Sequence, residues 1–366
     1  MKRFRTEVTF DERLLATYLL ITVGGLIMIY SASSILAESR FGSHWHFFRQ
    51  QLIWVVVSLL CIWVISRLDL KRWAVYSAPA LLFTILLLSL VFLMPARNGS
   101  QRWLFIGPLT FQPSELFKFL MIYYLAFSLA NPKRNLAKLK QLLLPYVPII
   151  GLGLALILFE PDLGTAAVIL LTALGMFFLA GARIYHLAVA VVPPVCVGVG
   201  LVAFVGYKQA RIIDYLAALV EPLNGSYQIR QAALTFGSGG LFGTGLGDGR
   251  QKLFFLPYPH TDFILATIGE EIGFVGLLVF FGLLMYLLWR GCQIATHQPD
   301  RFGYLLAIGM TWSLLVNIII NIGVVTALLP CTGLALPFLS YGGSSLLMSS
   351  AAVGVLINLS RREVRC

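Results

Sequence analysis

The sequence predicts an all-α polytopic membrane protein with ten transmembrane helices and one long outer loop between spans seven and eight. Composition is the first indication, because 58% of the 366 residues are hydrophobic and only 12% are charged, whereas soluble domains carry about 25% charged residues. The mean hydropathy of +0.85 agrees with this class. Long apolar runs recur along the whole chain, without the short alternating pattern of a β-barrel.

Each span is predicted from an apolar run of about 20 residues, the length that a helix needs to cross a bilayer. In chain order the runs are residues 14–35, 51–66, 74–94, 114–130, 142–159, 163–182, 186–207, 263–289, 304–328 and 344–360. The second and fourth are short, so their ends are the least well defined. Most runs mix Leu, Val and Ile with Gly and Ala, which suits closely packed helices. Residues 1–366 thus form a single membrane domain.

The distribution of Lys and Arg predicts the orientation. With the N-terminus inside, the inner segments hold 17 of these residues and the outer segments 9, and Lys118 lies within a span. Such a bias marks the cytoplasmic side, so both termini are expected in the cytoplasm. The net charge of +11 is then mainly a topology signal, and contact with anionic headgroups is preferred to nucleic-acid binding. The polar lead-in and the long first run argue against a cleavable signal peptide.

The long outer loop, residues 208–262, is aromatic, glycine-rich and apolar at its end, which favours a functional loop over a disordered one. Residues 214–220 fit a short amphipathic helix at the membrane interface. For the glycine-rich stretch at 237–247, the preferred interpretation is a flexible re-entrant turn. Backbone amides that bind a phosphate remain the alternative.

The first polar cluster on the outer side precedes and opens the fourth span. Glu115 and Lys118 are spaced i, i+3, so they can pair on one helix face. Two interpretations remain for these residues. One is a capped helix with a local ion pair, and the other is a ligand site. A cation below the outer membrane surface is costly, which favours function. Arg102 beside Trp103 is a candidate pair for pyrophosphate and sugar contacts.

Three further segments carry polar residues at helix ends. Asp162 lies in a tight turn and is at least as well explained as a helix cap. Asp262 lies at the mouth of the eighth span, where an ionisable residue is a functional candidate by default. Its neighbour His260 is preferred as a satisfied interfacial residue. Residues 342–345 form a polar, mobile entry to the last span, and the buried amides of Asn317 and Asn321 are expected to bond a neighbouring helix.

These segments together predict an outward-facing polar site at the rim of the bundle, with Asp162, Asp262, Lys118 and an Arg. A serine hydrolase is not supported, because no Gly-x-Ser-x-Gly motif occurs. The charged residues Glu270, Glu271 and Lys118 lie deep enough in the spans for a transporter to remain an alternative. The five cysteines show no metal-binding spacing.

Several of these motifs, in order and over nearly the whole chain, resemble the SEDS family (shape, elongation, division and sporulation). They are Gln112-Pro113-Ser114-Glu115 with Lys118, Pro161-Asp162-Leu163-Gly164-Thr165, the Gly-Ser-Gly-Gly loop, His260-Thr261-Asp262-Phe263, Gly269-Glu270-Glu271 and residues 337–345. The resemblance implies a multi-pass peptidoglycan glycosyltransferase of the bacterial inner membrane with a periplasmic outer loop. It also implies polymerisation of lipid II beside a class B penicillin-binding protein and other division or elongation proteins.

Within the family, residues 98–100, 249–252 and 268–271 look more like the division member FtsW, or its sporulation relative, than the elongation member RodA. Two positions depart from the common pattern, Tyr258 and Glu160, and no role is carried onto either. A lipid II flippase and a non-catalytic scaffold remain alternative functions.

The resemblance matches the essential acid of the family to Asp262, which would act as the general base of an inverting transfer. Candidate substrate-binding residues are Arg102, Trp103, Gln112, Glu115, Lys118, Asp162, Arg211, Lys252, His260, Thr261 and Ser344. A divalent cation, Mg²⁺ or Mn²⁺, is possible, but no ligand set for it is evident in the sequence.

Overall fold

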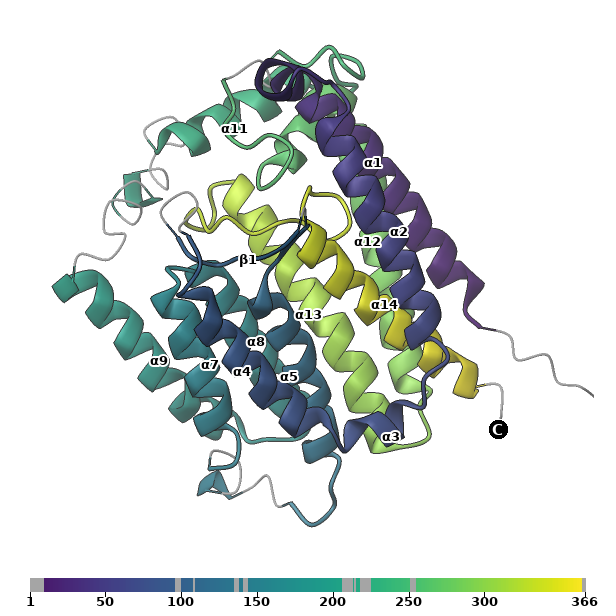
Figure 1. The fold of residues 1–366 in the computed structure, drawn as a ribbon, viewed down its shortest axis with the longest axis vertical. Coiled ribbons are helices and arrows are strands. Elements are labelled where there is room, and N and C mark those ends of the chain that lie inside the picture. Colours follow the sequence, from purple (N-terminus) through teal and green to yellow (C-terminus); the bar gives the residue numbers. More distant parts are fainter. Residues whose placement is uncertain are drawn as a thin grey trace, which may run out of the picture.

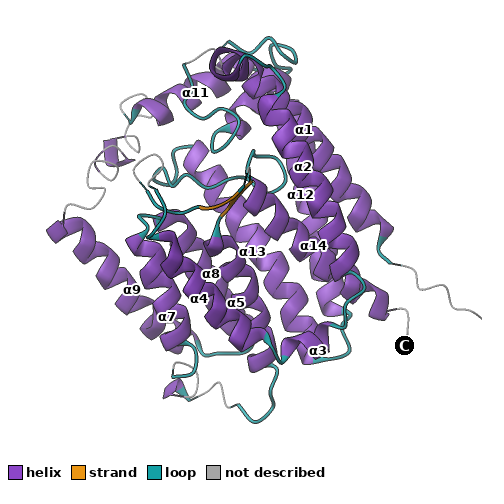
Figure 2. Ribbon diagram, in the orientation of Figure 1, coloured by secondary structure: helices purple, strands orange, loops and turns teal. Residues whose placement is uncertain are grey.

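A computed structural model gives the fold of the chain, which is a helical bundle with almost no strand (Figures 1 and 2). It describes residues 10–95, 100–107, 109–134, 138–140, 144–205, 213, 215–217, 225–250 and 255–363.

Every predicted span coincides with a helix. The helices are α1 (Glu12–Phe41), α2 (His46–Ile65), α4 (Ser77–Val91), α5 (Pro113–Leu129), α7 (Val147–Phe159), α8 (Leu163–Leu179), α9 (Ile184–Val205), α12 (Ile264–Thr296), α13 (Arg301–Val325) and α14 (Gly343–Glu363). Within the described residues, five are long and apolar enough to cross a membrane, namely α1, α2, α12, α13 and α14. The apolar helices α4, α7 and α8 are shorter.

The centre of the bundle is formed by α13 and α14. Their apolar windows are 72% and 78% buried, whereas those of α2 and α12 are 22% and 28% buried. Helix α14 packs mainly on α2, and α13 packs on α12, α8 and α5. Helix α9 lies at the outer edge, beside α8 (Figure 1). Peripheral helices therefore keep apolar faces exposed, as a surrounding lipid phase requires.

The two ends of the described chain meet at one end of the bundle. The backbone N–H of Asp11 donates to Ser360 Oγ at 3.2 Å, and the Arg290 guanidinium pairs with Asp11 at 2.6 Å. The short helix α3 (Leu70–Ala74) lies at the same end, where Tyr123 donates to the Leu70 carbonyl. Helix α11 (Tyr227–Gly239), which the sequence did not indicate, lies at the opposite end (Figure 1). Chain ends on the same side are the arrangement that an even number of membrane crossings would give.

A two-stranded antiparallel hairpin is a departure from the all-α prediction. Strands β1 (Leu104–Ile106) and β2 (Leu109–Phe111) pair with Leu104 opposite Phe111. The hairpin leads directly into α5, which has Pro113 in its first turn, a favoured position because proline needs no N–H partner there. It thereby places Gln112 at the N-cap of α5, with Arg102 just before β1.

Helix α12 is broken at Gly273, where φ is 69° and ψ is −172°. The glycine-rich stretch pairs with the backbone groups that the break leaves free. The N–H groups of Thr244 and Gly245 donate to the carbonyls of Glu270 and Glu271 at 2.9 and 3.0 Å. Across the break, the N–H of Phe274 donates to the Gly240 carbonyl at 3.0 Å. This stretch is thus a specific backbone partner of α12.

The carboxylates of two acids on α12 bind this stretch and the residues just after it. The Glu271 carboxylate accepts from the Gly247 N–H at 3.2 Å and from the Ser31 hydroxyl at 2.7 Å. The Glu270 carboxylate accepts from the Arg250 N–H at 2.8 Å. The amides of this stretch that were considered as phosphate ligands therefore bind the protein's own groups, which are backbone carbonyls for Thr244 and Gly245 and a carboxylate for Gly247. Residues 214–220, the expected interfacial helix, lie largely outside the described residues.

We predict that Gly243→Ala destabilises the protein. Gly243 has φ +82°, and an added Cβ would lie 2.2 Å from the Glu271 carbonyl oxygen. Strain of this kind costs about 1–3 kcal/mol before the overlap is counted, so the melting temperature should fall clearly. The matched control is Gly237→Ala, because nothing lies within 4 Å of a Cβ there. An equal melting temperature for both variants would contradict the pairing between this stretch and α12.

Candidate functional site

Asp262 lies in a tight turn that enters α12, immediately before the N-cap residue Phe263. Its side chain is partly exposed, while Phe263 is buried. Tyr258 adopts a left-handed conformation, with φ +55°, and its carbonyl accepts from the Thr261 N–H at 3.2 Å. The turn therefore places Asp262 at the mouth of the helix, as the sequence predicts.

The loop between α13 and α14 holds this turn in place. Ser340 Oγ donates to the Thr261 carbonyl at 2.7 Å, and the Tyr341 N–H donates to the His260 carbonyl at 2.8 Å. Asn321 Nδ2, on α13, donates to the carbonyls of both Asp262 and Leu334, at 3.2 and 2.6 Å. Asn321 thus bonds two loops instead of the expected neighbouring helix. Ser340 and Tyr341, just before the polar entry expected at 342–345, are thus structural supports for the Asp262 turn.

His260 is a packing residue in this structure. Its ring lies 4.6 Å from the Phe47 ring and 5.6 Å from the Tyr341 ring, measured between centroids. Burial, and secondarily the nearby Arg40 charge, lowers the pKa of His260 to about 4. The ring is therefore neutral at neutral pH and supplies no cation to a diphosphate. The preferred interpretation, a satisfied interfacial histidine, holds for the packing of the ring but not for Nδ1, which has no hydrogen-bond partner among the described residues.

A second group of candidate residues surrounds Asp162, the N-cap of α8. Its carboxylate accepts from the Thr165 N–H at 3.1 Å and from the Thr165 hydroxyl at 2.9 Å. It also accepts from Gln112 Nε2 at 3.3 Å and lies 3.5 Å from the Arg102 guanidinium. Asp162 is therefore a helix cap, as its position indicates, and also the centre of a polar cluster.

Arg102 is already committed to the turn between α7 and α8. Its Nε donates to the Glu160 carbonyl at 3.2 Å, and its Nη2 donates to the Pro161 carbonyl. Trp103, the next residue, is half-buried just before β1. The guanidinium thus has most of its donors in use within the protein.

Ser344 connects this cluster to α14. Its buried hydroxyl accepts from the Gln112 N–H at 2.9 Å and donates to the Thr110 carbonyl at 3.3 Å. The segment 332–334 brings the two groups together. A Cβ on Gly164 would lie 2.8 Å from Thr332, and one on Gly333 would lie 3.5 Å from the Asp262 carboxylate.

Lys118 and Glu115 form the ion pair that their spacing predicts, at 2.8 Å, with side chains only 7% and 6% exposed. A cavity of about 20 Å³ beside Lys118 is lined by residues of α5, α13 and α14, including Asn317. The pair is therefore inside the bundle, below the polar cluster. Arg211 and Lys252 lie outside the described residues. Among the described residues, no group of three or more His, Cys, Asp and Glu side chains is placed to hold a metal ion.

Glu160 belongs to this site, although the sequence analysis carried no role onto it. It is fully buried, and neither carboxylate oxygen has a hydrogen-bond partner among the described residues. Burial, reinforced by the Asp162 charge and opposed by Arg102, raises the pKa of Glu160 from 4.5 to about 8. The side chain is therefore mostly a neutral acid at pH 7. Its place within one turn of Asp162 was the available signal.

This pKa predicts a pH dependence of stability. Between about pH 4.5 and pH 8 the folded protein holds a proton on Glu160 that the unfolded chain has lost. The free energy of unfolding should therefore fall as the pH rises through this interval, by on the order of a few kcal/mol. Glu160→Gln should remove that slope in a melting-temperature series and be the more stable protein at pH 8. The exposed-acid variant Glu12→Gln should keep the wild-type slope, and an unchanged slope in Glu160→Gln would refute the assignment.

Known proteins resemble this chain over nearly its whole length. Residues 11–365 match the model of the FtsW/RodA/SpoVE family, described as cell cycle protein. The chain is 41% identical over 362 residues to stage V sporulation protein E of Bacillus subtilis, covering 97% of this chain and 98% of that protein. It is 40% identical over 356 residues to a probable peptidoglycan glycosyltransferase FtsW of Geobacter metallireducens, covering 96% and 95%.

Solved structures share the fold. A chain of a peptidoglycan synthase complex, in a study of polymerization and crosslinking, superposes with a TM-score of 0.78 at 27% identity, covering 97% of this chain and 98% of that one. The rod shape determining protein RodA of Thermus thermophilus superposes with a TM-score of 0.71 at 29% identity, with the same coverage. Family match, identity and fold agree with the motifs, and the chain therefore belongs to the FtsW/RodA/SpoVE family of cell cycle proteins.

Proposed function

We propose that this chain is a peptidoglycan glycosyltransferase that polymerises lipid II into β-1,4-linked glycan strands, with Asp262 as general base. The relatives named peptidoglycan glycosyltransferase FtsW and the fold shared with a peptidoglycan synthase complex support the activity. One structural observation carries the residue assignment. Asp262 is a partly exposed carboxylate at a helix mouth, with its backbone held by Asn321.

The chemistry requires one base and a leaving group. In the proposed step, the 4-hydroxyl oxygen of the acceptor sugar attacks the anomeric carbon of the donor. The bond from that carbon to the α-linked diphosphate breaks, so the new linkage is β. The hydroxyl proton passes to the Asp262 carboxylate, and the lipid diphosphate leaves. A single carboxylate is enough for such a direct inversion, because no covalent sugar intermediate forms.

Two of the candidate cations for the departing diphosphate are already paired within the protein. Arg102 and Lys118 each share their charge with a buried carboxylate, Asp162 and Glu115 respectively. We infer that they shape the site and contact the diphosphate only by exchanging those partners. Arg211 and Lys252 remain candidates from the sequence.

We further propose that all ten helices cross the bacterial inner membrane and that Asp262 faces the periplasm. A class B penicillin-binding protein is the proposed partner, supported by the likeness to a chain of a peptidoglycan synthase complex, with other division or elongation proteins around it. Transport of lipid II has less support, because the carboxylates of Glu270 and Glu271 are occupied by the backbone N–H groups of Arg250 and Gly247.

The activity is tested by incubating purified protein with lipid II in detergent and measuring glycan chains. A polymerase makes chains without a sealed membrane, whereas a flippase requires vesicles to show transport. A scaffold would make no chains and move no lipid. Absence of glycan with protein of normal melting temperature would remove the proposed activity.

The topology predicts opposite labelling of two single cysteines introduced into a cysteine-free variant. A cysteine at Ser226 should react with an impermeant thiol reagent added to intact spheroplasts, because loop 208–262 is proposed to be periplasmic. A cysteine at Asn135 should react only after lysis, because the neighbouring Lys and Arg residues place that connection inside. The reverse pattern would put Asp262 on the cytoplasmic side.

A further inference from the structure

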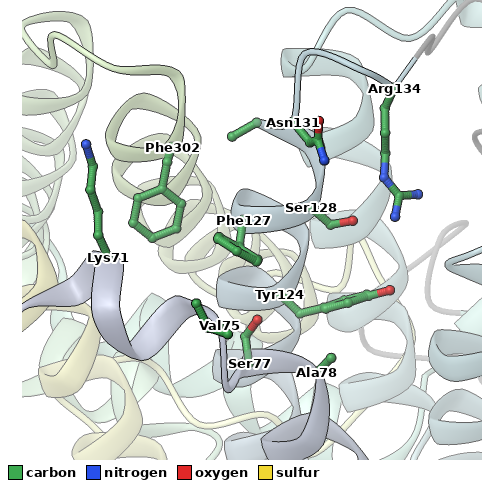
Figure 3. Close-up of a pocket in the computed structure, with 11 residues that line it drawn as sticks. Lys71, Val75, Ser77, Ala78, Tyr124, Phe127, Ser128, Asn131, Arg134 and Phe302 are labelled. Atoms are coloured by element: carbon green, nitrogen blue, oxygen red, sulfur yellow. The ribbon is translucent and has the colours of Figure 1, made fainter.

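A cavity of about 540 Å³ lies at the end of the bundle that carries the chain ends. It is lined by residues of α3, α4, α5 and the start of α13, with Arg134 beyond the end of α5 (Figure 3). Its volume is in the range of small-molecule sites. Phe302 lines it, whereas Asn321 holds the Asp262 turn. Nineteen helical residues separate these two positions, about 28 Å at 1.5 Å per residue, so this cavity is distinct from the polymerisation site.

The walls of the cavity are amphiphilic. Val75, Phe127 and Phe302 supply apolar surface, while Asn131 and Arg134 supply hydrogen-bond donors. No carboxylate is among the residues that line it. A ligand that matches these walls has an anionic head and an apolar tail.

Arg134 is held in place without a carboxylate. Its guanidinium lies over the Tyr146 ring, 5.2 Å from the centroid, and the Tyr146 hydroxyl is hydrogen-bonded to Ser128 at 3.0 Å. Among the described residues it makes no ion pair. In Figure 3 the guanidinium extends toward the side of the cavity that holds the Tyr124 and Ser128 hydroxyls. A positioned guanidinium fork matches the geometry of a phosphate.

Asn131 adds a second donor on the same side. Its side-chain oxygen accepts from the Lys133 N–H at 3.0 Å, which leaves the amide nitrogen to face the cavity (Figure 3). Lys71, on the opposite wall, is paired with Asp300 at 3.2 Å. Of the two cations that line the cavity, Arg134 is therefore the one available to bind an anion.

Exposed aromatic residues place the cavity at the membrane interface. Trp73 and Tyr76, beside the lining residues Lys71 and Val75, are 56% and 62% exposed. Such aromatic side chains gather where headgroups meet hydrocarbon. A phosphate bound at Arg134 would then lie at headgroup level, with an acyl chain along Phe127 and Phe302.

We propose that this cavity is a binding site for the phosphate headgroup of an anionic phospholipid. Arg134 and Asn131 bind the phosphate, and the apolar wall receives the upper part of an acyl chain. Basic pockets between membrane helices bind anionic headgroups by this combination of charge and apolar contact. The excess of positive charge in the connections at this end attracts such lipids to the opening.

Native mass spectrometry of delipidated protein tests the site with dioleoylphosphatidylglycerol and, as the neutral reference, dioleoylphosphatidylcholine. The wild-type protein should bind one phosphatidylglycerol at least tenfold more tightly than phosphatidylcholine. Arg134→Gln should abolish that preference. Arg183→Gln makes the same charge change at an exposed position that does not line the cavity, and it should keep the preference.

A second variant separates the cavity from surface charge. Ala78→Phe fills the cavity without a charge change, and it should weaken phosphatidylglycerol binding at an unchanged melting temperature. Equal losses in Arg134→Gln and Arg183→Gln, or full binding in Ala78→Phe, would overturn the proposal. Displacement of the lipid by millimolar inorganic phosphate would also overturn it, because the site would then recognise a soluble anion.

Discussion

Asp262→Asn should abolish polymerisation of lipid II while the protein folds and inserts normally. The amide is nearly isosteric with the carboxylate, and Asn321 holds the backbone carbonyl of residue 262 rather than its side chain. The turn should therefore survive the change. What the amide lacks is the ability to take the proton of the attacking hydroxyl. Loss of a general base costs about 10²–10⁴ in rate, so turnover should fall at least a hundredfold.

The measurement is the rate of glycan formation by purified protein, with the melting temperature recorded on the same preparation. Asp248→Asn is the matched control, since it makes the same change at an exposed acid of the loop 208–262 and should leave turnover unchanged. An Asp262→Asn protein that makes glycan at a near-native rate would end the general-base assignment. A variant that fails to fold would instead contradict the geometry of the turn.

The second large effect is expected from the buried ion pair. Lys118→Met should lower the free energy of unfolding by about 3–5 kcal/mol, the cost of leaving a buried charge without its partner. Glu115, at 2.8 Å and 6% exposed, is the charge left behind. Turnover should fall by more than the loss of folded protein accounts for. The reason is that Lys118 lies on α5, the helix on which the proposed site is built.

A double variant separates structure from function. Glu115→Gln combined with Lys118→Met removes both charges, so much of the lost stability should return. Turnover should stay low if Lys118 serves the diphosphate. Full recovery of turnover together with stability would make the pair purely structural, and normal turnover with normal stability in Lys118→Met alone would remove Lys118 from the site.

The sequence by itself determined the helices and their local chemistry. Each of the ten apolar runs predicted a helix, because the composition of a run is a local property of the sequence. The cap at Asp162 and the pairing of Glu115 with Lys118 depend on residues three apart, so they were readable from spacing alone. The position of Asp262 at the mouth of α12 was also readable locally, because the apolar run begins at the next residue.

Contacts between distant segments were decided only by the tertiary structure. Asn321 bonds the Asp262 turn across 59 residues, and Arg102 bonds Glu160 across 58. The glycine-rich stretch finds its partners at the Gly273 break, where the unpaired backbone of α12 requires them. The raised pKa of Glu160 depends on burial by surrounding elements. Which helix faces meet is set by packing of the whole bundle, and no local pattern in the chain records it.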